Sequence, residues 1–211
     1  MRISKNPDVR KNEILDAAEI LFATKGYNHT TINDILEAVA IAKGTFYYHF
    51  QSKEEVMDAI VMRFIAAGVD AARLIASDIA LTAHEKIFRI VMAQKPDDGK
   101  ERMIEQLHQV HNAEMHQKSL VETILQLTPV LTDVIEQGIE EGTFHTAYPR
   151  ETVEFLLVSS SFLFDDGIFQ WRPEELMRKA VAFTAVMEKT LGAEQGSFGY
   201  MLEAIGKRER S

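Results

Sequence analysis

The chain has 211 residues, 46% hydrophobic and 26% charged, a balance typical of a globular protein with one large or two modest domains. It contains no cysteine, which excludes disulfides, zinc–thiolate sites and thiol catalysis and favours a reducing compartment, so we expect the cytoplasm. The longest apolar run, residues 155–164, is too short to cross a bilayer, and no apolar segment follows the N-terminus. We therefore expect neither membrane insertion nor export.

The formal charge of −9 is unevenly distributed along the chain. Residues 1–53 carry seven Lys and Arg against six Asp and Glu, a net +1, whereas residues 54–211 carry sixteen against twenty-six, a net −10. An acidic protein of this kind can still present a local basic face to nucleic acid through its N-terminal part.

Apolar residues recur at helical spacing almost throughout, and strand-like alternation never persists, so the sequence predicts an all-α fold. The first helix is predicted over about 8–24, with Gly26 as a left-handed C-cap. A short second helix follows Thr30 and Thr31, which are both candidate N-caps, and Asp34 completes an approximate capping box.

A tight turn at 40–42 leads into a third helix, where Phe46 and Phe50 lie four residues apart and are expected to be buried together. Two short helices joined by such a turn are typical of a helix-turn-helix that reads DNA. Outward donors on the third helix, a glycine that lets the backbone approach the duplex, and the N-termini of the flanking helices can all contact DNA. The expected DNA-binding residues are Thr30, Thr31, Lys43, Gly44, Thr45, Tyr47, Tyr48, His49 and Lys53.

A long fourth helix is predicted from the S-x-x-E capping box of Ser52 and Glu55 to about residue 75. Pro129 should kink or split the helical block at 119–141. The remaining helices are expected to break at 94–101, Gly142, 147–151 and 171–175, and the C-terminal GKRERS to form a solvated tail.

The stretch TTINDILEAVAIAKGTFYYHFQSKEEVMDAI, preceded by ILDAAEILFATKGY, resembles the N-terminal domain of the TetR/AcrR family of bacterial transcriptional regulators. The resemblance covers roughly residues 10–60. It implies a DNA-binding domain at 1–52, a ligand-binding and dimerisation domain at 53–211, and no catalytic residue or cofactor. Where the family's turn commonly reads Ala-Gly-Val-Ser, this chain has Val39-Ala40-Ile41-Ala42. A glycine suited to positive φ and an N-capping hydroxyl are thus both replaced by alanine, each at a cost of about 1 kcal/mol.

Two C-terminal helices, predicted at 151–169 and 174–191, are apolar on more than one face and must be covered on two sides. We expect a four-helix dimer interface with two helices from each chain, as the resemblance also implies. The alternative is that both helices lie deep in a single-chain core. The expected interface residues are Val153, Leu156, Leu157, Ser160, Phe164, Leu176, Ala180, Phe183, Thr184 and Met187.

The resemblance also implies an effector cavity in the C-terminal domain, whose occupancy changes the spacing of the two DNA-binding domains in the dimer. The candidate lining residues are Phe88, Met92, Met103, Leu107, His108, His111, Met115 and Leu125, although a Met-rich stripe at helical spacing is more often plain core. His108, His111 and His116 lie near one helix face, yet no further ligand is identifiable and no metal site is predicted.

The sequence therefore predicts a homodimeric DNA-binding regulator that binds a palindromic operator and is released by a small-molecule effector. We expect no enzymatic activity, because the sequence offers no catalytic constellation. Repression is the commoner mode in the resembled family. One alternative is a helical metal-binding protein or enzyme built on the strip of His108, His111 and His116. Another, a helical adaptor, leaves the chemistry of the third helix unexplained.

Overall fold

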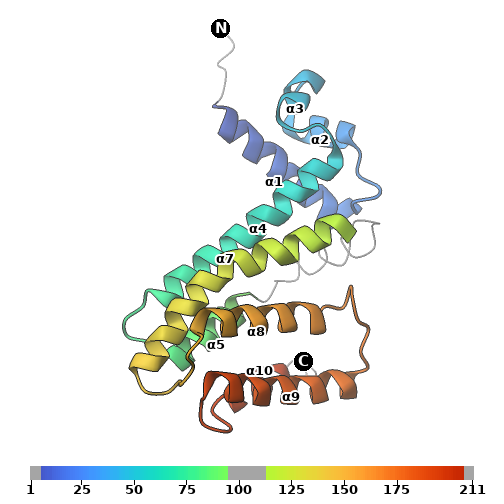
Figure 1. Cartoon of the computed structure of the whole chain (residues 1–211). Helices are drawn as coiled ribbons and strands as arrows, with labels where there is room; N and C mark the ends of the chain where they lie inside the picture. The colour runs from blue at the N-terminus through green and yellow to red at the C-terminus, as the bar shows by residue number, and fades with distance from the viewer. Residues whose placement is uncertain (1–5, 95–112, 207–211) are drawn as a thin grey trace. The chain divides into compact units, whose positions relative to one another are not determined.

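The computed structural model describes residues 6–94 and 113–206, and every regular element within them is a helix, which confirms the all-α prediction (Figure 1). The helices are α1 (Pro7–Lys25), α2 (Ile32–Val39), α3 (Lys43–His49), α4 (Lys53–Ala76), α5 (Ala83–Ala93), α7 (Ala113–Glu140), α8 (Pro149–Leu163), α9 (Pro173–Leu191) and α10 (Gly199–Gly206).

The chain divides into two compact units. Of the described residues, unit 1 contains 6–67 and 113–119, and unit 2 contains 68–94 and 120–206. The divisions fall inside α4 and α7, so each of these helices contributes residues to both units. No helix in the described ranges combines the length and apolarity needed to span a bilayer.

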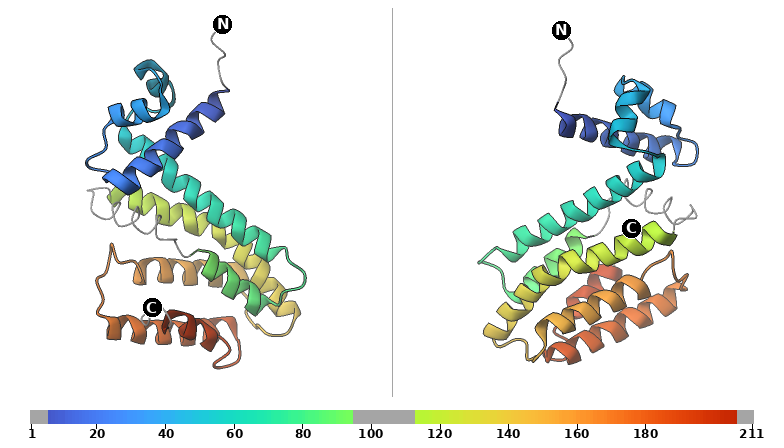
Figure 2. Two further views of the ribbon diagram at one scale, coloured as in Figure 1. Left: turned by 180° about the vertical axis from the view of Figure 1, so that it is seen from behind. Right: turned by 45° about the horizontal axis from the view of Figure 1, so that its top comes forward.

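Unit 1 has its core where α1, α2 and α3 group around the start of α4 (Figure 2). The Asn6 side chain caps α1 by accepting from the backbone N–H of Asp8 at 3.0 Å, and Pro7 occupies the first turn, where its missing N–H costs nothing. Gly26 follows α1 with φ 89° and ψ 145°. The predicted positive φ is present, but ψ is extended, so the prediction of a left-handed helical cap was wrong.

Helix α7 continues through Pro129 without a break, so it is not split into two helices. Two hydroxyls bond within this segment: Thr128 Oγ1 donates to the Ile124 carbonyl and Thr132 Oγ1 to the Thr128 carbonyl, each at 2.7 Å. These bonds do not replace the one that Pro129 cannot donate to the Leu125 carbonyl. Leu127 and Val130, on either side of the proline, are buried, and packing of this kind offsets the lost bond.

Unit 2 ends in a feature that the sequence analysis missed. Beyond α9 the chain turns back and forms α10, a helix that the sequence analysis did not predict, whereas residues 207–211 of the predicted GKRERS tail lie outside the described residues. Phe198 is fully buried, and the Tyr200 hydroxyl donates to the His84 carbonyl at 3.2 Å. The rings of His84, Phe144 and Phe198 pack against one another, with centroid distances of 4.9 Å from His84 to Phe144, 4.5 Å from His84 to Phe198 and 5.9 Å between the two phenylalanines. Burial lowers the pKa of His84.

Helix α8 ends at Leu163, six residues earlier than predicted. The Asp165 carboxylate accepts from the backbone N–H groups of Gly167 and Ile168, and the Trp171 indole donates to the Leu163 carbonyl at 2.9 Å. Because a short Asp side chain offers the backbone these competing bonds, it ends a helix that the apolar pattern alone would extend.

Candidate nucleic-acid interface

The turn between α2 and α3 fixes how the third helix is presented. Ala40 adopts the left-handed conformation with φ 53° and ψ 50°, and it has the only positive φ outside glycine in the described chain. Its N–H bonds to the Glu37 carbonyl at 3.2 Å, and the next N–H, of Ile41, reaches back to the Leu36 carbonyl at 3.0 Å. This six-to-one bond defines a Schellman motif, in which Ile41 and Leu36 pack on the core of unit 1.

Helix α3 is anchored by its two phenylalanines and directs its other side chains outward. Phe46 and Phe50 are 0% and 1% exposed with ring centroids 6.1 Å apart, as predicted. Opposite them, Lys43, Gly44, Tyr47 and Tyr48 are exposed, while Thr45 and His49 are half-buried. A Cβ on Gly44 would meet no atom within 4 Å, so the protein's own packing does not require glycine there. The open backbone suits close approach of a partner.

Two predicted contacts at the start of α2 need correction. Thr30 is 1% exposed and its hydroxyl donates to the Gly26 carbonyl at 2.8 Å, so it is neither the N-cap nor a phosphate donor. Thr31 is the cap, and Asp34 completes the predicted capping box. The Asp34 carboxylate also accepts from Lys25 Nζ at 2.6 Å. That bond and the bonds from Thr31 lower the pKa of Asp34 to about 2, so a carboxylate already occupies this helix N-terminus.

At the start of α4, too, the polar groups bond to other residues of the protein. Lys53 Nζ donates to the Tyr27 and Thr30 carbonyls at 2.7 and 3.0 Å and lies 4.1 Å from the Tyr27 ring centroid. The Glu55 N–H bonds to Ser52 Oγ as the predicted capping box requires, but its carboxylate accepts from the N–H of Gln51 at 2.6 Å. Lys53 thus connects the α1–α2 loop to α4. To bind a phosphate as well, its ammonium would have to direct part of its charge and hydrogen bonding away from the two carbonyls.

Sequence reasoning missed one basic residue on this surface. Lys11 of α1 is exposed, and its ammonium lies 5.7 Å from the ring centroid of Phe50, at the end of α3. Lys43 lies at the start of the same helix, with its ammonium 5.7 Å from the Tyr47 ring centroid. In the described chain neither lysine has a recorded carboxylate partner, so both charges are available to an anionic ligand. Only the fold shows that Lys11 lies near α3, because the two are more than thirty positions apart in the sequence.

The predicted effector residues that the structure describes do not assemble into one site. Met103, Leu107, His108 and His111 lie outside the described residues. Leu125 is 61% exposed, Met92 is half-buried, and Phe88 packs edge-on against Tyr200 of α10 at 5.3 Å. Met115 belongs to the core of unit 1, so its assignment to a cavity of the C-terminal domain was wrong. His116 is half-buried, and the described residues contain no group of three metal-ligating side chains.

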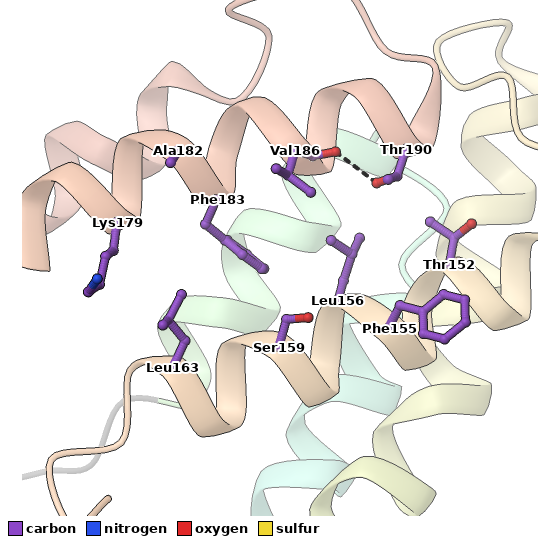
Figure 3. A pocket seen from close by; sticks show the side chains of 10 residues that line it. All are labelled: Thr152, Phe155, Leu156, Ser159, Leu163, Lys179, Ala182, Phe183, Val186 and Thr190. Atoms are coloured by element: carbon purple, nitrogen blue, oxygen red, sulfur yellow. Dashed lines mark hydrogen bonds between the residues drawn. The ribbon is translucent and has the colours of Figure 1, made fainter. Parts of the chain in front are cut away.

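Helices α8 and α9 run side by side in unit 2 and enclose a groove of about 380 Å³ between them (Figures 1 and 3). Four of the predicted interface residues are buried within the single chain and were wrongly assigned to a dimer interface: Val153, Ala180, Thr184 and Met187 are 3% to 7% exposed. Leu156, Leu157, Ser160, Phe164, Leu176 and Phe183 are partly buried. The apolar side chains left open are instead Phe155, Val158, Phe162, Val181 and Val186, from 41% to 73% exposed. We call these five residues the α8–α9 face.

A short helix anchored by two phenylalanines, held by a Schellman turn and presenting lysine and tyrosine outward, defines a helix-turn-helix DNA-binding protein. Two family models match the chain: "Bacterial regulatory proteins, tetR family" over residues 14–60 and "Tetracyclin repressor-like, C-terminal domain" over residues 97–186. The chain belongs to the TetR family of bacterial transcription regulators, and it is a DNA-binding regulator rather than an enzyme.

Individual relatives agree with this assignment. The chain is 30% identical to the HTH-type transcriptional repressor KstR2 of Rhodococcus jostii (strain RHA1) over 150 residues, which are 65% of this chain and 69% of KstR2. It is 48% identical over 46 residues, 22% of this chain and 25% of the relative, to IcaR of Staphylococcus epidermidis, a negative transcriptional regulator of the biofilm operon icaADBC.

Solved structures share the fold. SmeT, the repressor of the Stenotrophomonas maltophilia multidrug efflux pump SmeDEF, has a TM-score of 0.60 at 20% identity, covering 89% of this chain and 92% of its own. A TetR-family regulator from Mesorhizobium loti MAFF303099 has a TM-score of 0.61 at 18% identity, covering 88% and 98%.

Proposed function

We propose that the protein is a repressor that binds a palindromic operator as a homodimer and is released by a small-molecule effector. The outward face of α3, with Lys43, Tyr47 and Tyr48 exposed around an open Gly44, is the observation that carries the DNA-reading part. Relatives named as repressors, KstR2 and IcaR among them, support repression.

The homodimer is supported by the α8–α9 face. Phe155 is 73% exposed and Val186 is 52% exposed, on neighbouring helices that also line an apolar groove. Large apolar side chains concentrated in this way mark an interaction surface. A second copy of the chain presents the same face, as a two-fold dimer requires, and dimerisation gives the two reading heads that a palindrome needs.

Release by an effector is supported by a solved complex of SmeT with triclosan, a small molecule bound by a protein of the same fold. For this chain an effector would act by binding more tightly to a dimer whose heads do not match the operator. Compounds that raise the melting temperature of the free protein and also displace it from the operator would identify the effector. Compounds that do only the first bind without regulating.

The DNA-reading part is tested by fluorescence anisotropy with duplexes tiled across the DNA that flanks the coding region, at several salt concentrations. We expect tight binding to one palindromic tile. Tyr47→Phe and Lys43→Ala should weaken it, and Lys43→Ala should lower the log–log salt slope by about one. Lys189→Ala removes an equally exposed lysine from α9 and serves as the control. Unchanged affinity in both α3 variants would remove this face from the interface.

Sedimentation equilibrium tests the dimer. Phe155→Arg places a charge on the α8–α9 face, at its most exposed residue, and should yield a folded monomer. Leu74→Arg likewise replaces an exposed apolar side chain by arginine, at a residue 74% exposed near the end of α4, and should leave the dimer intact. A dimer that survives Phe155→Arg would place the interface elsewhere.

A further inference from the structure

Helix α1 brings a lysine to the C-terminal end of α3. Lys11 is exposed, and its ammonium lies 5.7 Å from the ring centroid of Phe50, the residue that follows α3. Phe50 is 1% exposed and packs with Phe46, so the core of unit 1 fixes the ring beside which Lys11 lies. The start of α1 and α3 lie at the same end of this unit (Figures 1 and 2). The fold therefore places the charge of Lys11 next to the helix that carries the predicted DNA contacts.

Lys11 differs from most basic side chains of unit 1 because no acidic side chain of the described residues neutralises it. Lys43 shares this property. The other basic side chains in the described part of unit 1 bond to protein acceptors: Arg10 to Glu13, Lys25 to Asp34, Lys53 to two carbonyls, Arg63 to Asp16 and Glu19, and Lys118 to Asp58. The charges of Lys11 and Lys43 are thus the ones that this unit leaves for an external anion.

These two lysines lie at opposite ends of α3. Lys43 is the first residue of the helix, and its ammonium is 5.7 Å from the Tyr47 ring centroid. At about 1.5 Å per residue, Lys43 and Phe50 are about 10 Å apart along the helix axis, close to the ~12 Å width of the major groove of DNA. Tyr47 and Tyr48 are exposed between them. A groove that received α3 would therefore meet a cation near each end of the helix, close to the phosphates that border the groove.

We propose that Lys11 is a DNA-binding residue, which contacts a backbone phosphate beside the C-terminal end of α3 while Lys43 contacts another phosphate at the opposite end. Two such contacts limit how far α3 can tilt in the groove, so Lys11 contributes to positioning and not to the choice of base. The proposal rests on the DNA-reading part of the proposed function. It requires neither the palindrome, the homodimer nor the effector.

The alternative role for Lys11 is a cation–π contact that only stabilises the end of α3. The two roles differ in their response to salt. Loss of one phosphate contact lowers the slope of log affinity against log salt by about 0.9, because fewer counterions are released, whereas loss of a contact within the protein leaves the slope unchanged. The salt dependence of binding is therefore the decisive readout.

Lys11→Gln removes the charge and keeps most of the aliphatic stem, so folding should survive. Arg10→Gln is the matched control, because it removes the same formal charge at the adjacent position from a side chain that already pairs with Glu13 at 2.6 Å. Lys11→Arg keeps the charge and tests rescue. The melting temperature of each variant checks that the protein is folded.

Fluorescence anisotropy measures binding to two duplexes of equal length, one of random sequence and one the tile that binds most tightly, between 50 and 200 mM salt. We expect Lys11→Gln to lower the slope by about 0.9 per bound chain on both duplexes, so that its affinity falls about three- to fourfold less over this range. Lys11→Arg and Arg10→Gln should keep the slope of the unsubstituted protein. Lys11→Gln combined with Lys43→Gln should lower the slope about twice as much as either change alone.

Neutral methylphosphonate linkages, placed singly along the tightest tile, locate the phosphate. One linkage should weaken binding of the unsubstituted protein and should not weaken binding of Lys11→Gln any further. This non-additivity is expected only if the Lys11 ammonium and that phosphate are partners.

An unchanged slope in folded Lys11→Gln would overturn the proposal, as would an equal fall in Arg10→Gln, which would show a general effect of charge. If no tile binds more tightly than the random duplex, the proposed operator function fails, and the random duplex still decides the role of Lys11. Absence of binding to every duplex would refute the DNA-reading part and this proposal with it.

Discussion

Ala40→Gly should stabilise the reading head, although glycine usually weakens a protein. Ala40 holds φ at 53°, where the Cβ of an L-residue crowds the following carbonyl oxygen at a cost of about 1–2 kcal/mol. Glycine removes that crowding but adds roughly 0.4–1 kcal/mol of unfolded-state entropy. The expected net gain is about 0.5–1 kcal/mol, and the Schellman hydrogen bonds are retained because they use only the backbone.

Amide hydrogen exchange in the full chain is the suitable assay, because the single tryptophan, Trp171, lies in unit 2 and does not report on the head. The N–H of Ile41, bonded to Leu36, and the N–H of Phe50, bonded to Phe46, should exchange roughly two- to fivefold more slowly in Ala40→Gly.

The matched control is Ala38→Gly, an exposed position inside α2 with an ordinary helical backbone. It should speed exchange of the same two amides, since glycine costs about 0.5–1 kcal/mol in a helix interior. The N–H of His145, bonded to Leu191 in unit 2, should not respond to either variant. Faster exchange in Ala40→Gly would show that the left-handed turn carries no strain and refute the reasoning.

Three further outcomes follow from particular contacts. Ala42→Ser adds the missing N-cap of α3 and should slow exchange of the Thr45 amide through about 1 kcal/mol of added stability. Burial lowers the pKa of His84, so folded unit 2 binds fewer protons at this residue than the unfolded chain does. The His84 contribution to the stability of unit 2 should therefore be complete above pH ~6.5 and fall as the pH drops below it. The melting temperature followed by tryptophan fluorescence should show this pH dependence, and His84→Gln should reduce it. Gly138→Ala would place a Cβ 2.1 Å from the Phe144 ring, and thermal melting should reveal a loss of about 1–3 kcal/mol.

The helix-turn-helix could largely be predicted from the sequence, because the signals that define it are local. Capping residues, the spacing of Phe46 and Phe50 and the length of the turn depend on neighbours within a few positions. Even the strain at Ala40 follows from the turn geometry. The burial of Thr30 and the internal bonds of Lys53 could not be predicted, because their partners, the carbonyls of Gly26 and of the α1–α2 loop, come within reach only after the chain has folded back.

Helices α8 and α9 show where periodicity stops being informative. When apolar residues surround a helix, the sequence indicates that two sides are covered but does not say which side faces the same chain. Val153 and Met187 were therefore predicted to lie in the dimer interface although the single chain buries them, and the exposed Phe155 was not among the predicted interface residues. Met115 was misplaced for a related reason, since periodicity places a residue on a helix face without naming the unit that the face contacts.

The carboxylates at the starts of α2 and α4 bear on how such a regulator finds its site in a cell. Asp34 and Glu55 already accept the backbone donors that a phosphate would use, and Lys25 and Lys53 are directed at protein acceptors. Fewer phosphates can then be neutralised at these two helix starts, so we expect binding to arbitrary DNA to be weaker and less dependent on salt than in a DNA-binding domain whose helix N-termini are open. Non-specific sites would then retain fewer of the molecules, and a larger share would be free to reach one operator.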